Sequence, residues 1–175
     1  SPLDLEACSR QIERPRNRLY QHWLLRRLLQ QTLADPFGIS ISERTALEGR
    51  GPDGPLRSIR AFDAAITAPR WGYGSVDDYY RQASPLQGLL AAAIAAELPP
   101  CLIVHAADDP WVPVAACERL LPLSQQAMQP LELLITAQGG HNGFHARCDR
   151  GRRETSPGNW GDRLTARWLL RLVGG

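Results

Sequence analysis

The chain contains no lysine, since all 20 of its basic residues are arginine. This absence excludes Schiff-base catalysis and a P-loop, because both chemistries use the primary amine of a lysine side chain. The formal net charge of +2 is too small by itself to predict binding to nucleic acid or to a membrane. We therefore expect no nucleic-acid partner.

Closely spaced cysteines and long apolar runs are also lacking. The four cysteines form no C-x-x-C pair, so a disulfide framework is not expected. No apolar run reaches the roughly 18 residues that a transmembrane helix needs, and no signal peptide is visible. These features predict a cytoplasmic protein with free thiols.

Residues 1–98 are predicted to form a helical, cap-like region. Ser1, Pro2 and Asp4 have the spacing of a helix start with Ser1 as the N-cap. A longer helix over 16–33 is predicted to carry an apolar stripe on one face, formed by Leu19, Tyr20, Trp23, Leu24 and Leu28. Arginines surround this stripe, so the helix either packs over a core or makes a peripheral membrane contact.

Three shorter helices are predicted after a loop rich in glycine and proline at 47–58. The first covers 57–67 and should end before Pro69, because a proline disfavours helical backbone in the residue before it. The second begins at a Ser75 cap and ends before Pro85, and the third is alanine-rich and covers 85–98.

Residues 99–175 have a β-α-β-α pattern. The apolar runs at 101–106 and 131–137 are typical of parallel strands buried on both faces, with a helix over 113–127 between them. A final helix is predicted over 159–175. Because two parallel strands alone make a poor sheet, this pattern predicts the end of a larger α/β sheet.

Polar residues follow both predicted strands. Asp108 and Asp109 come after the first, and His141 follows the second in "GGHNGF". Strand-end loops can bring a carboxylate and an imidazole into hydrogen-bonding reach, which is the acid and base of a catalytic triad. Each signal alone has a plainer interpretation, since an Asp pair before proline also suits a turn and a histidine after glycines also suits a loop.

Three blocks in order carry a family resemblance: "IRAFDAAITAPRWGYGSVDDYYRQASPL", "LPPCLIVHAADDPWVP" and "GGHNGF". They resemble the C-terminal half of YheT-like α/β-hydrolases. The resemblance implies an α/β fold with a helical cap at 1–98 and the C-terminal β-α-β-α part of the hydrolase core at 99–175. It also implies serine-type hydrolysis of carboxylic esters, of lipid or short-chain acyl type, with no cofactor and no metal.

The resemblance assigns His141 as the base and Asp109 as the acid, with Asp108 as an alternative acid. Trp111 and Phe144 are expected to line the substrate pocket. No serine lies in the G-x-S-x-G elbow that holds the nucleophile of this fold; Ser40 in "GISIS" comes nearest. We therefore expect the nucleophile to lie in a missing N-terminal half and the chain alone to be inactive.

Two other interpretations remain open at the sequence level. A metal-dependent hydrolase would use nitrogen and oxygen ligands from His105, Asp108, Asp109, His141 and His145. A catalytically inactive fragment, or a binding or scaffold subunit, would instead use the arginine-flanked helix at 16–33 to meet acidic lipid or another protein.

Overall fold

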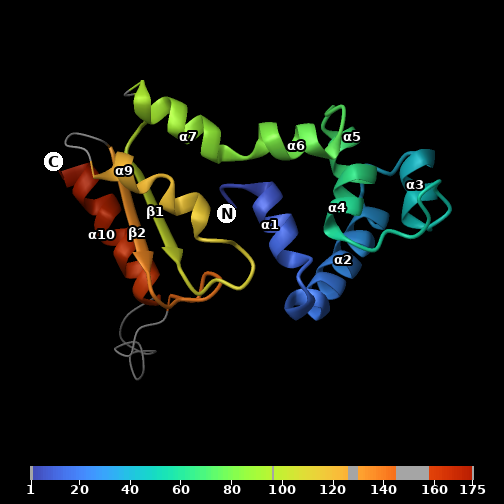
Figure 1. Cartoon of the computed structure of the whole chain (residues 1–175), viewed down its shortest axis with the longest axis horizontal. Helices are drawn as coiled ribbons and strands as arrows, with labels where there is room; N and C mark the ends of the chain where they lie inside the picture. The colour runs from blue at the N-terminus through green and yellow to red at the C-terminus, as the bar shows by residue number, and fades with distance from the viewer. Residues whose placement is uncertain (1, 96, 126–129, 145–157, 175) are drawn as a thin grey trace. The chain divides into compact units, whose positions relative to one another are not determined.

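A computed structural model describes residues 2–95, 97–125, 130–144 and 158–174 (Figure 1). The contacts between residues divide the chain into two units, Ser1–Pro85 and Leu86–Gly175. The regular elements described in the first unit are all helical, and the second unit carries the strands. In the described part of the chain, no helix is both long enough and apolar enough to cross a membrane.

The first unit consists of helices joined by short loops, with one longer loop at 48–58. In chain order the elements are α1 (Leu5–Ile12), the 3₁₀ turn η1 (Pro15–Asn17), α2 (Arg18–Leu33), α3 (Ile41–Leu47), α4 (Ile59–Phe62), the π-helical turn η2 (Asp63–Thr67), α5 (Ala68–Arg70) and α6 (Val76–Ala83). The helix predicted over 16–33 and the loop that follows α3 are confirmed.

The core of this unit forms between α2, α4 and η2. Leu25 packs with Phe62 and Ile66, and partly buried leucines of the same α2 face surround them. The predicted apolar stripe of α2 is only partly right: Leu28 packs against the core, but Leu19 is 89% exposed and Trp23 is 53% exposed, and the buried residue is Leu25, at 5% exposed. Leucines occur on several sides of this helix, so the contact with Phe62 decides which side is buried.

Two predicted helix ends also change. The first helix begins at Leu5 with Asp4 as its N-cap, whose Oδ1 accepts a hydrogen bond from Ala7 N at 2.9 Å. The predicted Ser1 cap lies outside the described residues. The helix expected to end before Pro69 continues through it as α5, because the wide π turn directly before it accommodates a residue without an N–H donor.

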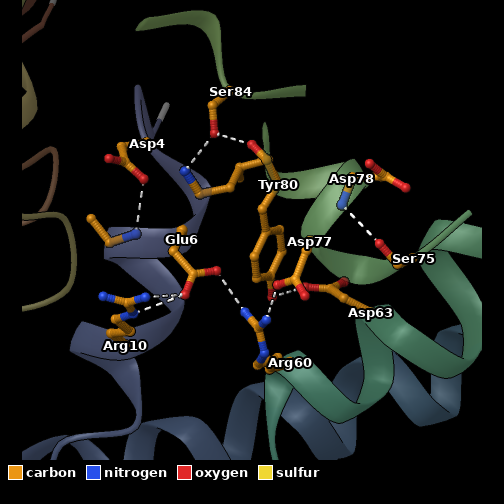
Figure 2. A network of polar contacts seen from close by, with 12 residues as sticks. Asp4, Glu6, Arg10, Arg60, Asp63, Ser75, Asp77, Asp78, Tyr80 and Ser84 are labelled. Atoms are coloured by element: carbon orange, nitrogen blue, oxygen red, sulfur yellow. Dashed lines mark hydrogen bonds and ion pairs between the residues drawn. The ribbon is translucent and has the colours of Figure 1, made fainter. Parts of the chain in front are cut away.

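A polar network joins α1, α4 and α6 (Figure 2). The Arg60 guanidinium contacts Glu6 Oε2 at 2.6 Å and also pairs with Asp77. Beside it, Tyr80 Oη donates to Asp63 Oδ2 at 2.7 Å, and the Arg60 guanidinium lies 5.3 Å from the centre of the Tyr80 ring. Burial raises the pKa of Asp63, against the lowering effect of hydrogen bonds from Thr67 and Tyr80.

The second unit contains a two-stranded parallel sheet. Its elements are α7 (Pro85–Ile94), which begins in the last residue of the first unit, then β1 (Cys101–Ala106), α8 (Ala115–Glu118), α9 (Leu121–Ser124), β2 (Leu131–Thr136) and α10 (Trp160–Gly174). The strands pair from Cys101 with Leu131 to Ala106 with Thr136. Figure 1 shows them side by side with α10 alongside.

The predicted β-α-β-α order is confirmed, with one correction. The single helix expected over 113–127 is two short helices, and Pro122 lies in the first turn of the second one. Proline suits that position because the first N–H groups of a helix have no partner within the helix. Residues 126 and 127 lie outside the described part. The helices and small parallel sheet are compatible with part of an α/β fold.

Candidate active site

The two loops that follow β1 and β2 build the candidate site. Because the strands are parallel and end together at the Ala106–Thr136 pair, their carboxyl ends lie at one edge of the sheet. The loop after β1 carries Asp108, Asp109 and Trp111, and the loop after β2 carries His141 and Phe144. The sheet therefore places the predicted acid, base and pocket residues in two neighbouring loops.

Asp109 is the most enclosed polar group of this site, with a side chain that is 5% exposed. Its Oδ1 accepts hydrogen bonds from the backbone N–H groups of Trp111 at 2.8 Å and Val112 at 2.9 Å, and its Oδ2 lies 3.0 Å from His141 Nδ1. Burial raises the pKa of this carboxyl, but the two backbone donors and His141 outweigh burial and lower it overall. Asp109 is therefore a carboxylate at neutral pH.

His141 contacts Asp109 through one of its two ring nitrogens, Nδ1. Its side chain is 33% exposed, and its ring lies edge-on to the indole of Trp111 with centroids 4.7 Å apart. An ionised Asp109 carboxylate can accept hydrogen bonds but cannot donate one. The contact therefore places the proton of the neutral ring on Nδ1 and the lone pair on Nε2. Asn142 Nδ2 lies 3.5 Å from Nε2.

Asp108 makes a different contact from its neighbour. Its Oδ1 accepts a hydrogen bond from the backbone N–H of Gly140 at 2.8 Å. The carboxylate in contact with His141 is that of Asp109, whereas Asp108 ties the two loops together one residue before the histidine.

The loop after β2 has a tight backbone that sequence reasoning did not single out. Asn142 and Phe144 have positive φ angles of 62° and 41°, a conformation that is uncommon for residues other than glycine. A Cβ atom on Gly139 would come within 2.9 Å of both Ala106 and Phe144, so only glycine fits there without a shift. The sequence signal for this turn is the run "GGHNG", because glycine and asparagine tolerate positive φ best, and Gly140 and Asn142 both adopt it.

Phe144 packs toward the start of α10. Its ring lies 6.4 Å from that of Trp160, and Gly143 O accepts a hydrogen bond from Asn159 Nδ2 at 3.1 Å. The start of α10 therefore supports the loop that carries His141. Asn159 is therefore a further residue of this site that the sequence analysis did not single out.

Ser40, the serine nearest to an elbow pattern, and two further serines have structural contacts in the first unit. Ser40 Oγ accepts from Glu43 N at 3.2 Å, Ser75 Oγ accepts from Asp78 N at 3.0 Å, and Ser84 Oγ accepts from Leu5 N at 2.9 Å. The first two are helix N-caps, as predicted for Ser75. None of these three lies on a strand-to-helix turn of the nucleophile-elbow type.

The ligand set of the metal hypothesis is not assembled within the described residues. There, no three side chains of histidine, cysteine, aspartate or glutamate are grouped to hold a metal ion. His105 lies within β1, with its Nε2 3.2 Å from Val112 O. His145 lies outside the described residues.

Comparison with known proteins relates the chain to esterases and lipases. It is 34% identical over 148 residues to the Escherichia coli (strain K12) protein named "Putative esterase YheT", covering 82% of this chain and 39% of that protein. It is 34% identical over 139 residues to the Mus musculus protein "Phospholipase ABHD3", covering 79% of this chain and 31% of that one. The yeast (Saccharomyces cerevisiae) "Monoacylglycerol lipase" matches at 34% over 90 residues, 51% of this chain and 18% of that protein.

The chain thus spans less than half the length of these relatives. No family model matches it, and no solved structure matches it. The named relatives are α/β-hydrolases, and they support ester hydrolysis in general.

Proposed function

From the premise that this chain belongs to the YheT-like α/β-hydrolases, we propose that Asp109 and His141 are the acid and base of a Ser-Asp-His triad that hydrolyses carboxylic esters. The observation that carries this proposal is the 3.0 Å contact between His141 Nδ1 and Asp109 Oδ2 at the carboxyl ends of two parallel strands. Asp precedes His along the chain, which is the order used by α/β-hydrolases.

Each residue has a defined task in this mechanism. The Asp109 carboxylate holds the proton of His141 on Nδ1 and stabilises the imidazolium that forms during the reaction. Nε2 of His141 then takes the proton of the attacking serine and returns it to the leaving alcohol. The pKa of Asp109, lowered by its hydrogen bonds against the effect of burial, keeps this carboxylate ionised at neutral pH.

The nucleophile in this proposal is a serine outside these 175 residues, because none of the chain's serines lies in a G-x-S-x-G elbow. Residues 99–175 then form the C-terminal part of the hydrolase core and residues 1–98 the cap-like region. The isolated chain should be inactive, since loss of the nucleophile alone lowers the rate of a triad enzyme by about a millionfold.

The substrate that we propose is a lipid ester or a short-chain acyl ester. Two of the relatives are named as a phospholipase and a monoacylglycerol lipase, enzymes that act on lipid esters. Trp111 supplies an aromatic ring directly against His141, where an apolar acyl group would meet the base. Phe144 is the second proposed pocket residue, three positions after His141 in the same loop.

The experiment compares two forms of the protein. The DNA upstream of the Ser1 codon is translated, and the longest reading frame and the 175-residue chain are each treated with a fluorophosphonate probe that labels activated serines. We expect labelling of the longer form at an upstream G-x-S-x-G serine, its loss in His141→Gln, and no labelling of the 175-residue chain. Labelling of a serine within the chain, or labelling unchanged by His141→Gln, would contradict the proposal.

A further inference from the structure

The segment from 14 to 33 has an unusual charge pattern for a helix whose inner side packs into a core. It carries Arg14, Arg16, Arg18, Arg26 and Arg27 and no aspartate or glutamate. All of these arginines are exposed. None of them pairs with a carboxylate among the residues that the structure describes, whereas five other arginines of the same unit do so: Arg10, Arg50, Arg60, Arg70 and Arg81.

Large apolar side chains lie among these charges on the outer side of α2. Leu19 and Trp23 are exposed while Leu25, on the inner side, is buried against Phe62. Trp23 is one turn after Leu19, and Arg26 and Arg27 are one turn after Trp23, so these side chains are neighbours on one face. The Arg27 guanidinium lies 5.8 Å from the centre of the Trp23 ring. We call this set (Leu19, Trp23, Arg26 and Arg27) the outer face of α2.

We propose that the outer face of α2 binds the surface of a bilayer that contains anionic lipid. The uncompensated arginines complement lipid phosphates, and each basic residue near an anionic membrane strengthens binding by about fivefold. The indole of Trp23 and the side chain of Leu19 enter the boundary between headgroups and acyl chains, where tryptophan partitions favourably. Helix α2 then lies parallel to the membrane while its inner side stays in the protein core.

A bilayer suits this face better than a protein or a nucleic acid. Two exposed apolar side chains on one convex helix offer much less area than the roughly 800 Å² that each partner buries in a stable protein interface. A nucleic acid would neutralise the arginines but would give the exposed aliphatic side chain of Leu19 no apolar partner. This surface does not involve Asp109 or His141, so its test is independent of the proposed hydrolase chemistry.

The test measures flotation of the full chain with vesicles of phosphatidylcholine alone or of an equimolar mixture with phosphatidylserine. We expect binding to the mixed vesicles that weakens at high salt, and little binding to phosphatidylcholine. Arg26→Gln combined with Arg27→Gln should lower the partition coefficient by about tenfold or more, and Trp23→Ala by several-fold. Far-UV circular dichroism checks that both variants keep the helical content of the unchanged chain.

A matched control removes the same charge from another part of the unit. Arg44 and Arg57 are exposed and lie outside α2, so Arg44→Gln combined with Arg57→Gln should change the partition coefficient by less than about twofold. Equal losses in the two double variants would show a general effect of charge and overturn the proposal. The absence of binding to the mixed vesicles would also overturn the proposal. The same holds if Trp23→Ala abolishes self-association of the chain while the chain does not bind the mixed vesicles.

Discussion

Asp108 and Asp109 contact two consecutive residues of the loop after β2: Asp108 Oδ1 accepts from Gly140 N at 2.8 Å, and Asp109 Oδ2 lies 3.0 Å from His141 Nδ1. The first carboxylate fixes the backbone of the loop and the second fixes the imidazole. Adjacent residues of the same type therefore have separable tasks, which a pair of matched variants distinguishes.

Asp109→Asn should lower kcat of the complete hydrolase far more than Asp108→Asn. The amide cannot stabilise the imidazolium, and it can hold the ring in the wrong tautomer, which costs about 10⁴-fold in a comparable triad. Asp108→Asn keeps an oxygen that accepts from Gly140, so its loss should stay within about tenfold. Hydrolysis of p-nitrophenyl butyrate gives both values, and a larger loss in Asp108→Asn would assign the acid to that residue.

The stability of the fold should fall in acid partly through Asp109. Its pKa is lower in the folded protein than in the unfolded chain, so the carboxylate stabilises the fold at neutral pH. This contribution is present above the ordinary aspartate value of 3.8 and is lost as pH falls through the lower folded value. Urea unfolding measured between neutral pH and pH 3 should therefore show a smaller decrease in the free energy of unfolding for Asp109→Asn than for the unchanged protein. Equal decreases in the two proteins would contradict this role.

Asp63 should affect stability in the opposite direction. Burial raises the pKa of Asp63 in the folded protein. Its ionisation therefore lowers the free energy of unfolding as the pH rises from 3.8 through the raised pKa. Asp63→Asn should remove this decrease while keeping one acceptor for Tyr80. Asp53→Asn, an exposed aspartate in the loop before α4, is the control and should leave the slope unchanged. Equal slopes in Asp63→Asn and the unchanged protein would contradict the assignment.

The free energies of unfolding of two leucine variants should reveal which side of α2 faces the core. Leu25→Ala removes a buried side chain that packs on Phe62, and it should cost about 2–5 kcal/mol in the free energy of unfolding. Leu19→Ala changes an exposed side chain and should stay within about 0.5 kcal/mol. Chemical denaturation measures both, and the reverse order would restore the stripe predicted from the sequence.

Gly139→Ala should disturb the loop that carries His141. Its Cβ would lie 2.9 Å from Ala106 Cβ and 2.9 Å from Phe144 Cδ1, so the loop must move. We expect a loss of about 1–3 kcal/mol in stability, typical of overpacking, together with lower hydrolase activity. Gly88→Ala in α7 meets no atom within 4 Å and should be neutral or stabilising. Similar losses in the two variants would show that close packing at Gly139 is not the cause.

The strands and the placement of the candidate site follow from local sequence. The apolar runs of β1 and β2 are continuous, and parallel strands bring the residues after them together, so the proximity of Asp109 and His141 was predictable. Their part in catalysis stays a prediction. The buried side of α2 was not predictable, because leucines occur around the helix and only the contact with Phe62 selects one side. The position of Asn142 depends on a backbone φ of 62°, which residue type alone does not determine.

Arg60 contacts Glu6 of α1 and Asp77 of α6 from its own place in α4. One guanidinium thus connects three helices that are distant in the sequence, while Asp63 and Tyr80 close the same cluster from η2 and α6 (Figure 2). Opening α4 breaks both ion pairs of Arg60, and opening α1 or α6 breaks one of them. The slowest amide protons of the three helices should therefore exchange with solvent at a common free energy, as one cooperative unit.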